Sequence, residues 1–268
     1  MKYYREEALD ESLVAAGLRR GDVVFVHSAL FALGPIKGVA MNEIPRRIYD
    51  AIRRRLGPKG TIVVPTFNFD FCKGERFDRQ QTPSKGMGAF SEYIRCLPDA
   101  LRSPHPMQSL AAVGALADDL AHRDTPGAFD SGSSFDALIE LDALILMLGC
   151  GINAVSMVHF AEEKAGVPYR YHKEFSAPYR DGDRIDRRTY RMYVRDLELD
   201  PEVRVEPVGR VLRRRGELRR LALGGGAVEA CRTRHFASAS ILLLQRDPRA
   251  LIRPGAHQRL ERLHVARR

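Results

Sequence analysis

The feature that most constrains this chain is an alternation of short apolar runs with longer runs of helical period. Four strand-like runs stand out: Val23–Val26, Thr61–Val64, Leu110–Gly114 and Ala143–Leu148. Between the first two, apolar residues recur at helical spacing over Met41–Leu56, and Gly57-Pro58 ends the pattern. This order is typical of a sheet with helices on its faces. We therefore predict an α/β fold with three layers, α/β/α, around a central sheet.

Further helices are predicted over Leu13–Leu18, Gly88–Leu97, Ala115–Ala121, Phe135–Glu140, Ala154–Lys164 and Val208–Arg214. From Tyr179 onward, short alternating runs broken by Asp-Gly and Asp-Pro turns predict a hairpin or small antiparallel region over residues 179–205. Leu221–Leu223 and Ile241–Leu244 are predicted strands. Residues 66–88 show no sustained period, and we expect a long surface loop there. The whole chain, 1–268, is expected to form one domain.

Composition narrows the class of protein. The 268 residues are 44% hydrophobic and 29% charged, which is typical of a globular domain. No run of about 20 apolar residues predicts a membrane span, and the N-terminus lacks the features of a secretory signal. We expect a cytoplasmic location. The four cysteines are scattered without a CxxC pair, so neither a disulfide framework nor a metal site is expected.

The net charge of +9 is concentrated at one end of the chain. Residues 180–268 contain 22 Lys and Arg against 12 Asp and Glu, whereas residues 1–179 contain 21 against 22. Such asymmetry is compatible with nucleic-acid binding, but the chain has no zinc-finger, RNP or basic-region motif. A solvated basic face, or a positive field over a cleft that receives a polyanion, is the preferred interpretation.

The segment Arg102–Ser109 is one candidate for chemistry. It places a cation, hydroxyls and His105 in a stretch that two prolines stiffen. One interpretation is an ordinary polar loop. The other is a rigid anion-binding loop in which Arg102, Ser103 and Ser109 bind a phosphate or an amide of an extended ligand.

Two further loops are candidates for ligand binding. Ser133 or Ser134 is predicted to cap the helix that follows Gly132, and the unpaired N–H groups there also suit a phosphate or a carbonyl. His27 and Ser28 lie at the carboxyl end of the first predicted strand, where ligands commonly bind in α/β sheets. An ordinary polar strand end is the alternative there.

His159 is the candidate general base. It follows a predicted buried strand, lies in a predicted helix, and has Glu162 and Glu163 three and four residues later on the same face. A structural histidine is the alternative, but an imidazole oriented by a carboxylate suits the deprotonation of an amine. The chain has no phosphate-binding P-loop, dinucleotide GxGxxG, GxSxG or HExxH motif, which argues against NTP hydrolysis, Rossmann redox chemistry, α/β-hydrolase action and zinc proteolysis.

Taken together, these segments resemble the aminoglycoside 3-N-acetyltransferase family. The matching elements are VHSAL at 26–30, LGPKGTIVVPTF at 56–67, FD at 77–78, TPS at 82–84, MGAFSEYIR at 87–95, RSPHPMQSLAAVG at 102–114, FDSGSSFDAL at 129–138, LMLGCGINAVSMVHFAEEKAGVPYR at 146–170, and a weaker C-terminal GRVLRRRGELRR…GGGA…LLLQRDP. They cover nearly the full chain, in the order found in the family.

The resemblance implies transfer of an acetyl or similar acyl group from acetyl-CoA to an amine, by direct attack in a ternary complex and without a metal. It implies His159 as general base, Glu162 as its partner and Glu92 as a second acidic group near the acceptor. The residues implied to line the coenzyme are His27, Ser28, Ala29, Leu30, Arg102, Ser103, His105, Ser109, Gly132, Ser133 and Ser134. The hairpin of residues 179–205 is expected at the acceptor site. No nucleic-acid or membrane partner is expected, and the protein is expected to be a monomer or homodimer.

The sequence also departs from the family's resistance members. They usually have an aspartate where Asn153 stands, and the basic C-terminal third opposes the field that a cationic aminoglycoside would prefer. The long loop that follows residue 65 resembles biosynthetic members. We therefore expect a single amino sugar, nucleotide-linked or otherwise less cationic than an aminoglycoside, or an amino-bearing metabolite intermediate, as the acceptor. A larger acyl donor and a non-catalytic coenzyme A-binding or regulatory protein are the alternatives.

Overall fold

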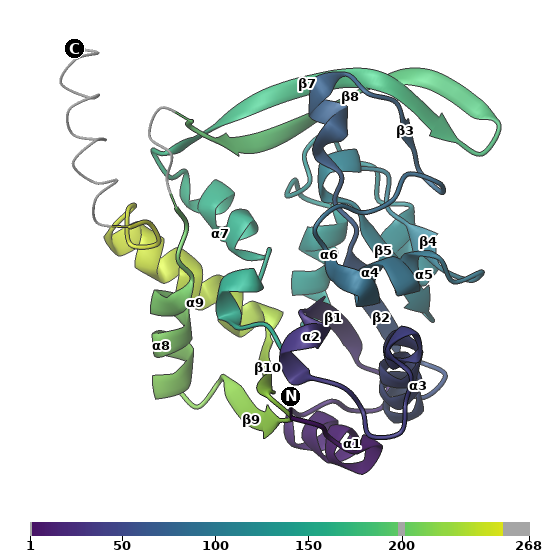
Figure 1. Cartoon of the computed structure of the whole chain (residues 1–268). Helices are drawn as coiled ribbons and strands as arrows, with labels where there is room; N and C mark the ends of the chain where they lie inside the picture. The colour runs from purple at the N-terminus through teal and green to yellow at the C-terminus, as the bar shows by residue number, and fades with distance from the viewer. Residues whose placement is uncertain (1, 198–201, 254–268) are drawn as a thin grey trace.

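The computed structural model describes residues 2–197 and 202–253, and its main element is a seven-stranded mixed sheet (Figure 1). The strands are β1 (Val23–Ser28), β2 (Thr61–Pro65), β4 (Leu101–Arg102), β5 (Leu110–Gly114), β6 (Leu144–Leu148), β9 (Arg219–Leu223) and β10 (Gly226–Arg232). They lie in the order β4-β5-β2-β1-β6-β10-β9. β1 pairs in parallel with both β2 and β6, and the outer strands are added by antiparallel pairing. The parallel centre places the carboxyl ends of β1, β2 and β6 at one edge.

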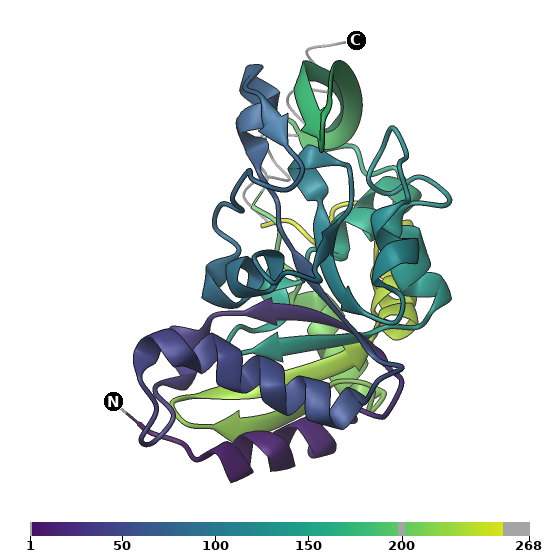
Figure 2. The same cartoon turned by 90° about the vertical axis from the view of Figure 1, so that its right-hand side faces the viewer.

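Helices cover both faces of this sheet (Figure 2). On one face lie α1 (Glu6–Ala15), α3 (Ile44–Leu56) and α4 (Gly88–Arg95); on the other lie α5 (Ala117–Ala121), α6 (Ser134–Glu140), α7 (Val158–Ala165), α8 (Glu206–Arg214) and α9 (Thr233–Arg246). Short turns complete the chain: α2 (Leu30–Leu33), η1 (Met41–Glu43), η2 (Phe69–Lys73), η3 (Pro106–Gln108) and η4 (Ile152–Ala154).

The central strands are apolar along their length because both of their faces are covered. In β1, Val24 and Val26 pack into the core on the α1 and α3 side, whereas Val23 and Phe25 pack into the core on the α6 and α9 side. A continuous apolar run of this kind is what a strand buried on both faces requires. The predicted three-layer α/β/α fold is confirmed.

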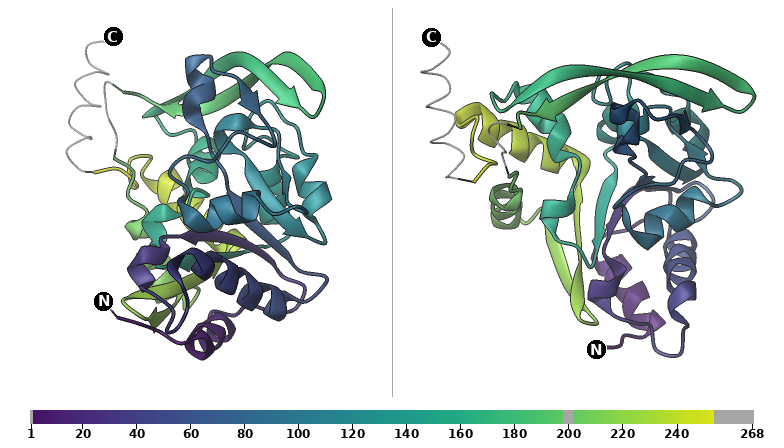
Figure 3. Two further views of the ribbon diagram at one scale, coloured as in Figure 1. Left: turned by 45° about the vertical axis from the view of Figure 1, so that its right-hand side comes forward. Right: turned by 45° about the horizontal axis from the view of Figure 1, so that its top comes forward.

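A second, smaller sheet consists of β3 (Phe77–Asp78), β7 (Arg170–Asp181) and β8 (Arg184–Arg195). β7 and β8 form a long antiparallel hairpin that crosses the top of the molecule in Figure 1 and projects at its upper edge in Figure 3. The antiparallel region is therefore present, but it begins at Arg170 rather than at residue 179. The first half of β7 is largely exposed, so its side chains show no alternation that sequence could reveal. Residues 198–201 of the predicted region lie outside the described residues.

Four other predictions were wrong in detail, and one of them is the helix over Leu13–Leu18, since α1 spans Glu6–Ala15. The segment 66–88 is not only a surface loop, because Phe67, Phe71 and Phe77 are buried and η2 and β3 form within it. Ile241–Leu244 belongs to helix α9 and not to a strand. Helix α7 begins at Val158, four residues after the predicted start, because residues 152–154 form a separate 3-10 turn. No helix in the described ranges is both long and apolar enough to cross a bilayer.

Candidate functional site

A cavity of about 830 Å³ lies where the carboxyl ends of β1 and β2 meet the hairpin. His27 at the end of β1 and Pro65 at the end of β2 contribute to one wall, and the segment that leads from η4 into α7 contributes another. The first residues of β7 and the last residues of β8 line it from the hairpin. This is the edge of an α/β sheet at which ligands commonly bind.

Local backbone geometry sets the position of α7. Gly149 follows β6 with φ +74°, and a Cβ there would lie 2.5 Å from the carbonyl oxygen of Ala29. Only glycine allows the loop after β6 to approach the end of β1 this closely. At the other end of α7, Gly166 takes the left-handed conformation that ends a helix. The short helix between these glycines carries His159 and Glu162.

His159 lies at the cavity wall with its side chain 31% exposed. Its Nδ1 lies 2.7 Å from Glu162 Oε2 and 3.1 Å from the guanidinium of Arg170. An ionised carboxylate only accepts hydrogen bonds, so the shorter contact places the proton on Nδ1. Nε2 is then the acceptor nitrogen, and no hydrogen bond within residues 2–197 and 202–253 occupies it.

Glu162 is fully buried, and its charge is balanced locally. Burial raises its pKa, but the hydrogen bond from His159 and the charges of His159 and Arg170 lower the pKa by more, so the net shift is downward. Arg170 Nε lies 2.8 Å from Glu162 Oε2, and its NH1 donates to the carbonyl of Tyr193 at 3.2 Å. A chain of contacts from Arg170 through Glu162 to His159 thus connects the hairpin to the candidate base. The predicted pairing of His159 with Glu162 occurs, whereas the sequence analysis gave Arg170 no role. Its place as the last residue of the family-like segment 146–170 was the signal that could have identified it.

His27 also lines the cavity, but it is neutral and buried. Burial lowers the pKa of His27 to about 3. Its Nε2 accepts from the main-chain N–H of Ser156 at 3.2 Å, so the proton lies on Nδ1. Nδ1 and the Oγ of the adjacent Ser28 are buried polar atoms without a hydrogen-bond partner among the described residues. A buried polar atom without a partner is a position that a polar ligand could complete.

Two of the residues predicted to contact the coenzyme at this strand end, Ala29 and Leu30, have no polar side chain. Ala29 donates its N–H to the carbonyl of Leu148 at 2.9 Å, so this group is already used within the fold. Leu30 begins α2 and is half-buried. Of residues 27–30, His27 lines the cavity and the other three do not, and the unpaired polar atoms of the segment are His27 Nδ1 and Ser28 Oγ rather than a group of Ala29.

Arg102 lies outside this cavity and serves as an internal connector. Its guanidinium donates to Ser109 Oγ at 3.0 Å and to the carbonyl oxygens of Thr66 and Thr82. It also lies 4.6 Å from the centre of the Phe77 ring. Burial lowers the pKa of Arg102 to about 9. The side chain is buried among these neutral partners, so the geometry gives it a structural role and does not favour the expected phosphate contact.

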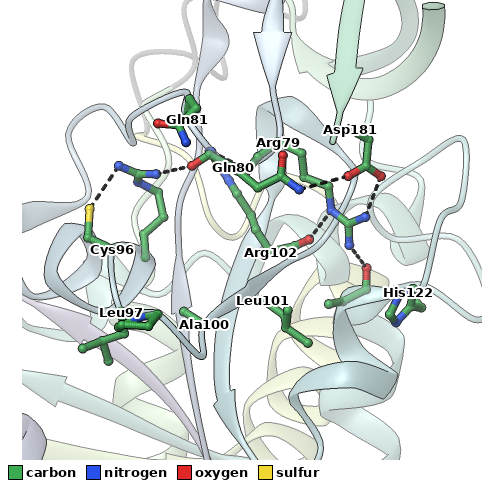
Figure 4. A pocket seen from close by; sticks show the side chains of 13 residues that line it. Arg79, Gln80, Gln81, Cys96, Leu97, Ala100, Leu101, Arg102, His122 and Asp181 are labelled. Carbon is green, nitrogen blue, oxygen red and sulfur yellow. Dashed lines mark hydrogen bonds and ion pairs between the residues drawn. The ribbon is translucent and has the colours of Figure 1, made fainter. Parts of the chain in front are cut away.

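A second hollow, of about 700 Å³, surrounds this connector (Figure 4). Figure 4 shows Arg79 pointing toward Asp181 and toward the main chain of Arg102. Its ion pair with Asp181 is 2.8 Å long, and another of its nitrogens donates to the carbonyl of Ala121. The arginines of this hollow are bonded to partners within the fold, so it is a structural cluster that links β3, β4 and β7.

The remaining residues of the 102–109 segment are also used internally. Ser103 Oγ accepts from the N–H of Leu110 at 2.9 Å, and Ser109 Oγ donates to the carbonyl of Thr66 at 2.8 Å. His105 accepts from the N–H of Gln108 through Nδ1 and donates from Nε2 to the carbonyl of Arg191 at 3.1 Å. Burial lowers the pKa of His105 to about 4. These contacts therefore hold the hairpin in place. Within the segment, Gln108 is the residue that lines the cavity.

The loop at Gly132–Ser134 caps α6. Ser133 Oγ accepts from the N–H of Asp136 at 3.1 Å, which confirms the predicted N-cap, and Ser134 Oγ donates to the carbonyl of Leu120 at 2.8 Å. Gly132 has φ +80° in the turn before the helix. None of the three lines the cavity of His159.

Glu92 is likewise separate from that cavity. It lies on α4, where it accepts from Arg95 at 3.0 Å and from Ser84 Oγ at 2.8 Å. Burial raises the pKa of Glu92, but the hydrogen bonds from Arg95 and Ser84 lower it further, to about 2. Glu92 connects α4 to the segment before it, and the structure does not bring it together with His159. No group of three or more His, Cys, Asp or Glu side chains in the described part of the chain could hold a metal ion.

Comparison with known proteins gives the family. The family model "Aminoglycoside 3-N-acetyltransferase" matches residues 25–245. Aminoglycoside N(3)-acetyltransferase III of Salmonella sp is 30% identical over 205 residues, which are 67% of this chain and 68% of that protein. The apoenzyme of aminoglycoside acetyltransferase AAC(3)-IVa is 25% identical, with a TM-score of 0.76 over 94% of this chain and 92% of that one. A binary complex of AAC-IIIb with CoASH shares the fold, with 22% identity and a TM-score of 0.78 over 91% of this chain and 97% of that one. The chain belongs to the aminoglycoside 3-N-acetyltransferase family and is an acetyl-CoA-dependent N-acetyltransferase.

Proposed function

We propose that this protein transfers the acetyl group of acetyl-CoA to an amine in a ternary complex, with His159 as general base. The observation that carries the proposal is the orientation of one imidazole. Nδ1 is held by Glu162 at 2.7 Å, and the open Nε2 belongs to a side chain that lines the 830 Å³ cavity. A positioned base must lie within hydrogen-bond reach of the proton that it removes, and a cavity of this size admits an acceptor amine.

Each residue of the group has a separate task. Nε2 of His159 accepts the proton that the amine nitrogen loses as it attacks. The carboxylate of Glu162 fixes the tautomer through Nδ1 and stabilises the imidazolium that forms. Arg170 holds Glu162 ionised and in place from the hairpin, at 2.8 Å. Arg170 is a positioning residue in this scheme and not a catalytic one.

The coenzyme end of the cavity is proposed at His27 and Ser28. When bound there, acetyl-CoA would supply a thioester: the amine nitrogen attacks its carbonyl carbon, the C–S bond breaks, and CoA would leave as a thiolate that takes up one proton, in balance with the proton that the amine loses. His27, which lines this end, has a buried Nδ1 without a partner among the described residues, and the adjacent Ser28 has a buried Oγ of the same kind, so the residues present fit a polar ligand. The binary structure of AAC-IIIb with CoASH supports a coenzyme in this fold.

The acceptor is proposed to be an amino sugar, an aminoglycoside or another amino-bearing metabolite. The names of the relatives support an aminoglycoside. Asn153, which stands where resistance members usually have aspartate, lines the same cavity as His159 and accepts from the N–H of Val205 at 2.7 Å. A neutral amide at this position favours a less cationic acceptor.

The test is thiol release from acetyl-CoA with a panel of amines, comparing the wild type with His159→Ala. We expect turnover to fall by about 10²- to 10⁴-fold, the usual contribution of a positioned base, while affinity for CoA changes little. His172→Ala is the matched control, because that imidazole is 48% exposed on β7 and contacts Glu163 at 3.4 Å. Unchanged turnover in the His159 variant, or an equal loss in the control, would remove the assigned role.

A further inference from the structure

The cavity that His159 lines is also lined by several large apolar side chains that are exposed to solvent. Phe69 on η2, Tyr171 on β7 and Leu197 after β8 all line it, with exposed fractions of 43%, 49% and 73%. Phe175 and Met192 lie beside them on the hairpin and are half-buried. Scattered exposed apolar residues need no explanation, but a group of them around the mouth of one cavity marks a binding surface for an apolar body.

Among the described residues, Lys173 and Arg195 line the cavity from the hairpin, whereas the charge of Arg170 beside them is balanced by the buried Glu162. Lys173 Nζ lies 5.4 Å from the centre of the Phe175 ring, so a cation and an aromatic face are presented together. Within the described ranges, Glu202 is the one carboxylate that lines the cavity, and it forms an ion pair with Arg253 at 2.9 Å.

These two features disfavour a polyhydroxylated polycation. A ligand with several ammonium groups would have to approach Lys173 and would leave Phe69 and Tyr171 in contact with sugar hydroxyls. Like charges across an interface cost affinity, and apolar rings gain little from polar partners. A ligand with one flat apolar group and one anionic group would instead satisfy both sets of side chains.

We propose that the acceptor of this enzyme carries an aromatic group and a negative charge in addition to its amine, the combination found in a nucleotide-linked amino sugar. Tyr171, Phe69 and Phe175 contact the aromatic group, and Lys173 binds the anion. The amine then points inward toward His159. This assignment rests on the function proposed above, since it describes the second substrate of the same site.

The coenzyme itself contains an adenine ring and phosphates, so the same chemistry has two sources. Simultaneous binding distinguishes them. If the hairpin wall binds the acceptor, a nucleotide-linked amino sugar binds while CoA is saturating. If the wall binds the coenzyme's nucleotide, CoA displaces that ligand.

Binding to the full chain is therefore measured by calorimetry, with UDP-glucosamine, glucosamine and kanamycin as probes, each with saturating CoA. We expect UDP-glucosamine to bind at least about tenfold more tightly than glucosamine or kanamycin, and its affinity to fall with added salt. Tighter binding of kanamycin, equal binding of glucosamine, or displacement of UDP-glucosamine by CoA would each overturn the proposal.

Two pairs of variants locate the binding surface. Lys173→Glu is expected to weaken UDP-glucosamine binding by about tenfold or more, and Tyr171→Ala by about threefold or more. The controls lie on β8 outside the cavity. Arg187→Glu makes the same change of charge as Lys173→Glu, and Ile185→Ala removes another exposed apolar side chain, which is 62% exposed. They should leave the affinity within about twofold. An equal loss in the controls would overturn the proposal, because it would show a general field rather than a site.

Kinetics separate this proposal from the proposed function. In thiol-release assays, Lys173→Glu should raise KM for UDP-glucosamine and leave KM for acetyl-CoA unchanged. The reverse result would assign the wall to the coenzyme and overturn the inference. Absence of thiol release with every amine would contradict the proposed function, whereas the binding measurements would still decide whether the cavity selects an anionic aromatic ligand.

Discussion

At the scale of single residues, the site depends on the buried carboxylate of Glu162, which contacts both His159 and Arg170. Glu162 is fully buried, so removing one of its partners leaves part of a charge without compensation. Arg170 supplies that compensation from another element, with its side chain only 9% exposed. Arg170, which contacts both His159 and Glu162, therefore also stabilises the fold.

Arg170→Met tests this coupling. We expect the free energy of unfolding to fall by about 3 kcal/mol, the scale for breaking a buried ion pair from one side, and turnover to fall with it because Glu162 no longer holds His159. Urea denaturation and thiol release measure the two effects. Arg180→Met is the control, since Arg180 lies on the same strand, is 41% exposed and pairs loosely with Asp78 at 3.7 Å; it should cost less than about 1 kcal/mol. Equal effects of the two variants would contradict the assignment.

At the scale of secondary-structure elements, ionic contacts hold the segment of residues 79–85 against α4. Glu92 of α4 accepts from Ser84 and from Arg95, and Arg95 in turn donates to the carbonyl of Gln80. These hydrogen bonds lower the pKa of Glu92 to about 2, against the opposing effect of burial. The contact between α4 and residues 79–85 therefore depends on the ionised form of Glu92.

This dependence predicts how stability varies with pH. A carboxyl group whose pKa is lowered by folding stabilises the protein above its unfolded pKa and loses that contribution as pH falls toward its folded pKa. The difference in free energy of unfolding between the wild type and Glu92→Gln should therefore be complete at pH 7 and shrink as pH falls from about 4.5 toward 2. Urea denaturation at pH 7, 4 and 3 measures it. A difference that stays constant or grows at low pH would show that the ionised carboxylate is not responsible.

At the scale of the whole molecule, the sheet and the hairpin are joined through the segment 102–109. Arg102 connects the strand ends to the chain around Thr82, His105 bonds to the carbonyl of Arg191 on β8, and Tyr179 OH donates to the carbonyl of Pro104 at 2.8 Å. The hairpin that forms one wall of the cavity is thus anchored to the central sheet by main-chain carbonyls and neutral side chains.

Arg102→Ala should accordingly act on stability and not on coenzyme binding. Removing the guanidinium leaves the half-buried carbonyl of Thr82 without this donor, whereas the carbonyl of Thr66 keeps its hydrogen bond from Ser109, so we expect a loss of roughly 1 to 3 kcal/mol. Thermal and urea denaturation measure this loss, and calorimetry with CoA should show affinity changed by less than about twofold in the folded fraction. Arg76→Ala, which removes an exposed arginine nearby, is the control. If the Arg102 variant were as stable as the wild type but bound CoA more weakly, the result would instead support the phosphate contact that the sequence suggested.

The sequence by itself determined the layered fold and the pairing of His159 with Glu162. Apolar runs such as Val23–Val26 report burial on both faces, and a spacing of three residues on one helix places Glu162 beside His159. Both follow from local periodicity, which a single sequence contains. The N-cap at Ser133 is equally local.

Only the tertiary structure decided what the polar residues outside α7 do. Arg102 and Glu92 look like ligand-binding groups in sequence, yet their partners lie on segments up to 36 residues away and within the fold. Arg170 and the exposed rings around Lys173 carry no periodic signal, because the hairpin is solvated over much of its length. Periodicity reports which side of an element is buried, whereas the identity of a polar group's partner depends on long-range contacts that form only when the chain has folded.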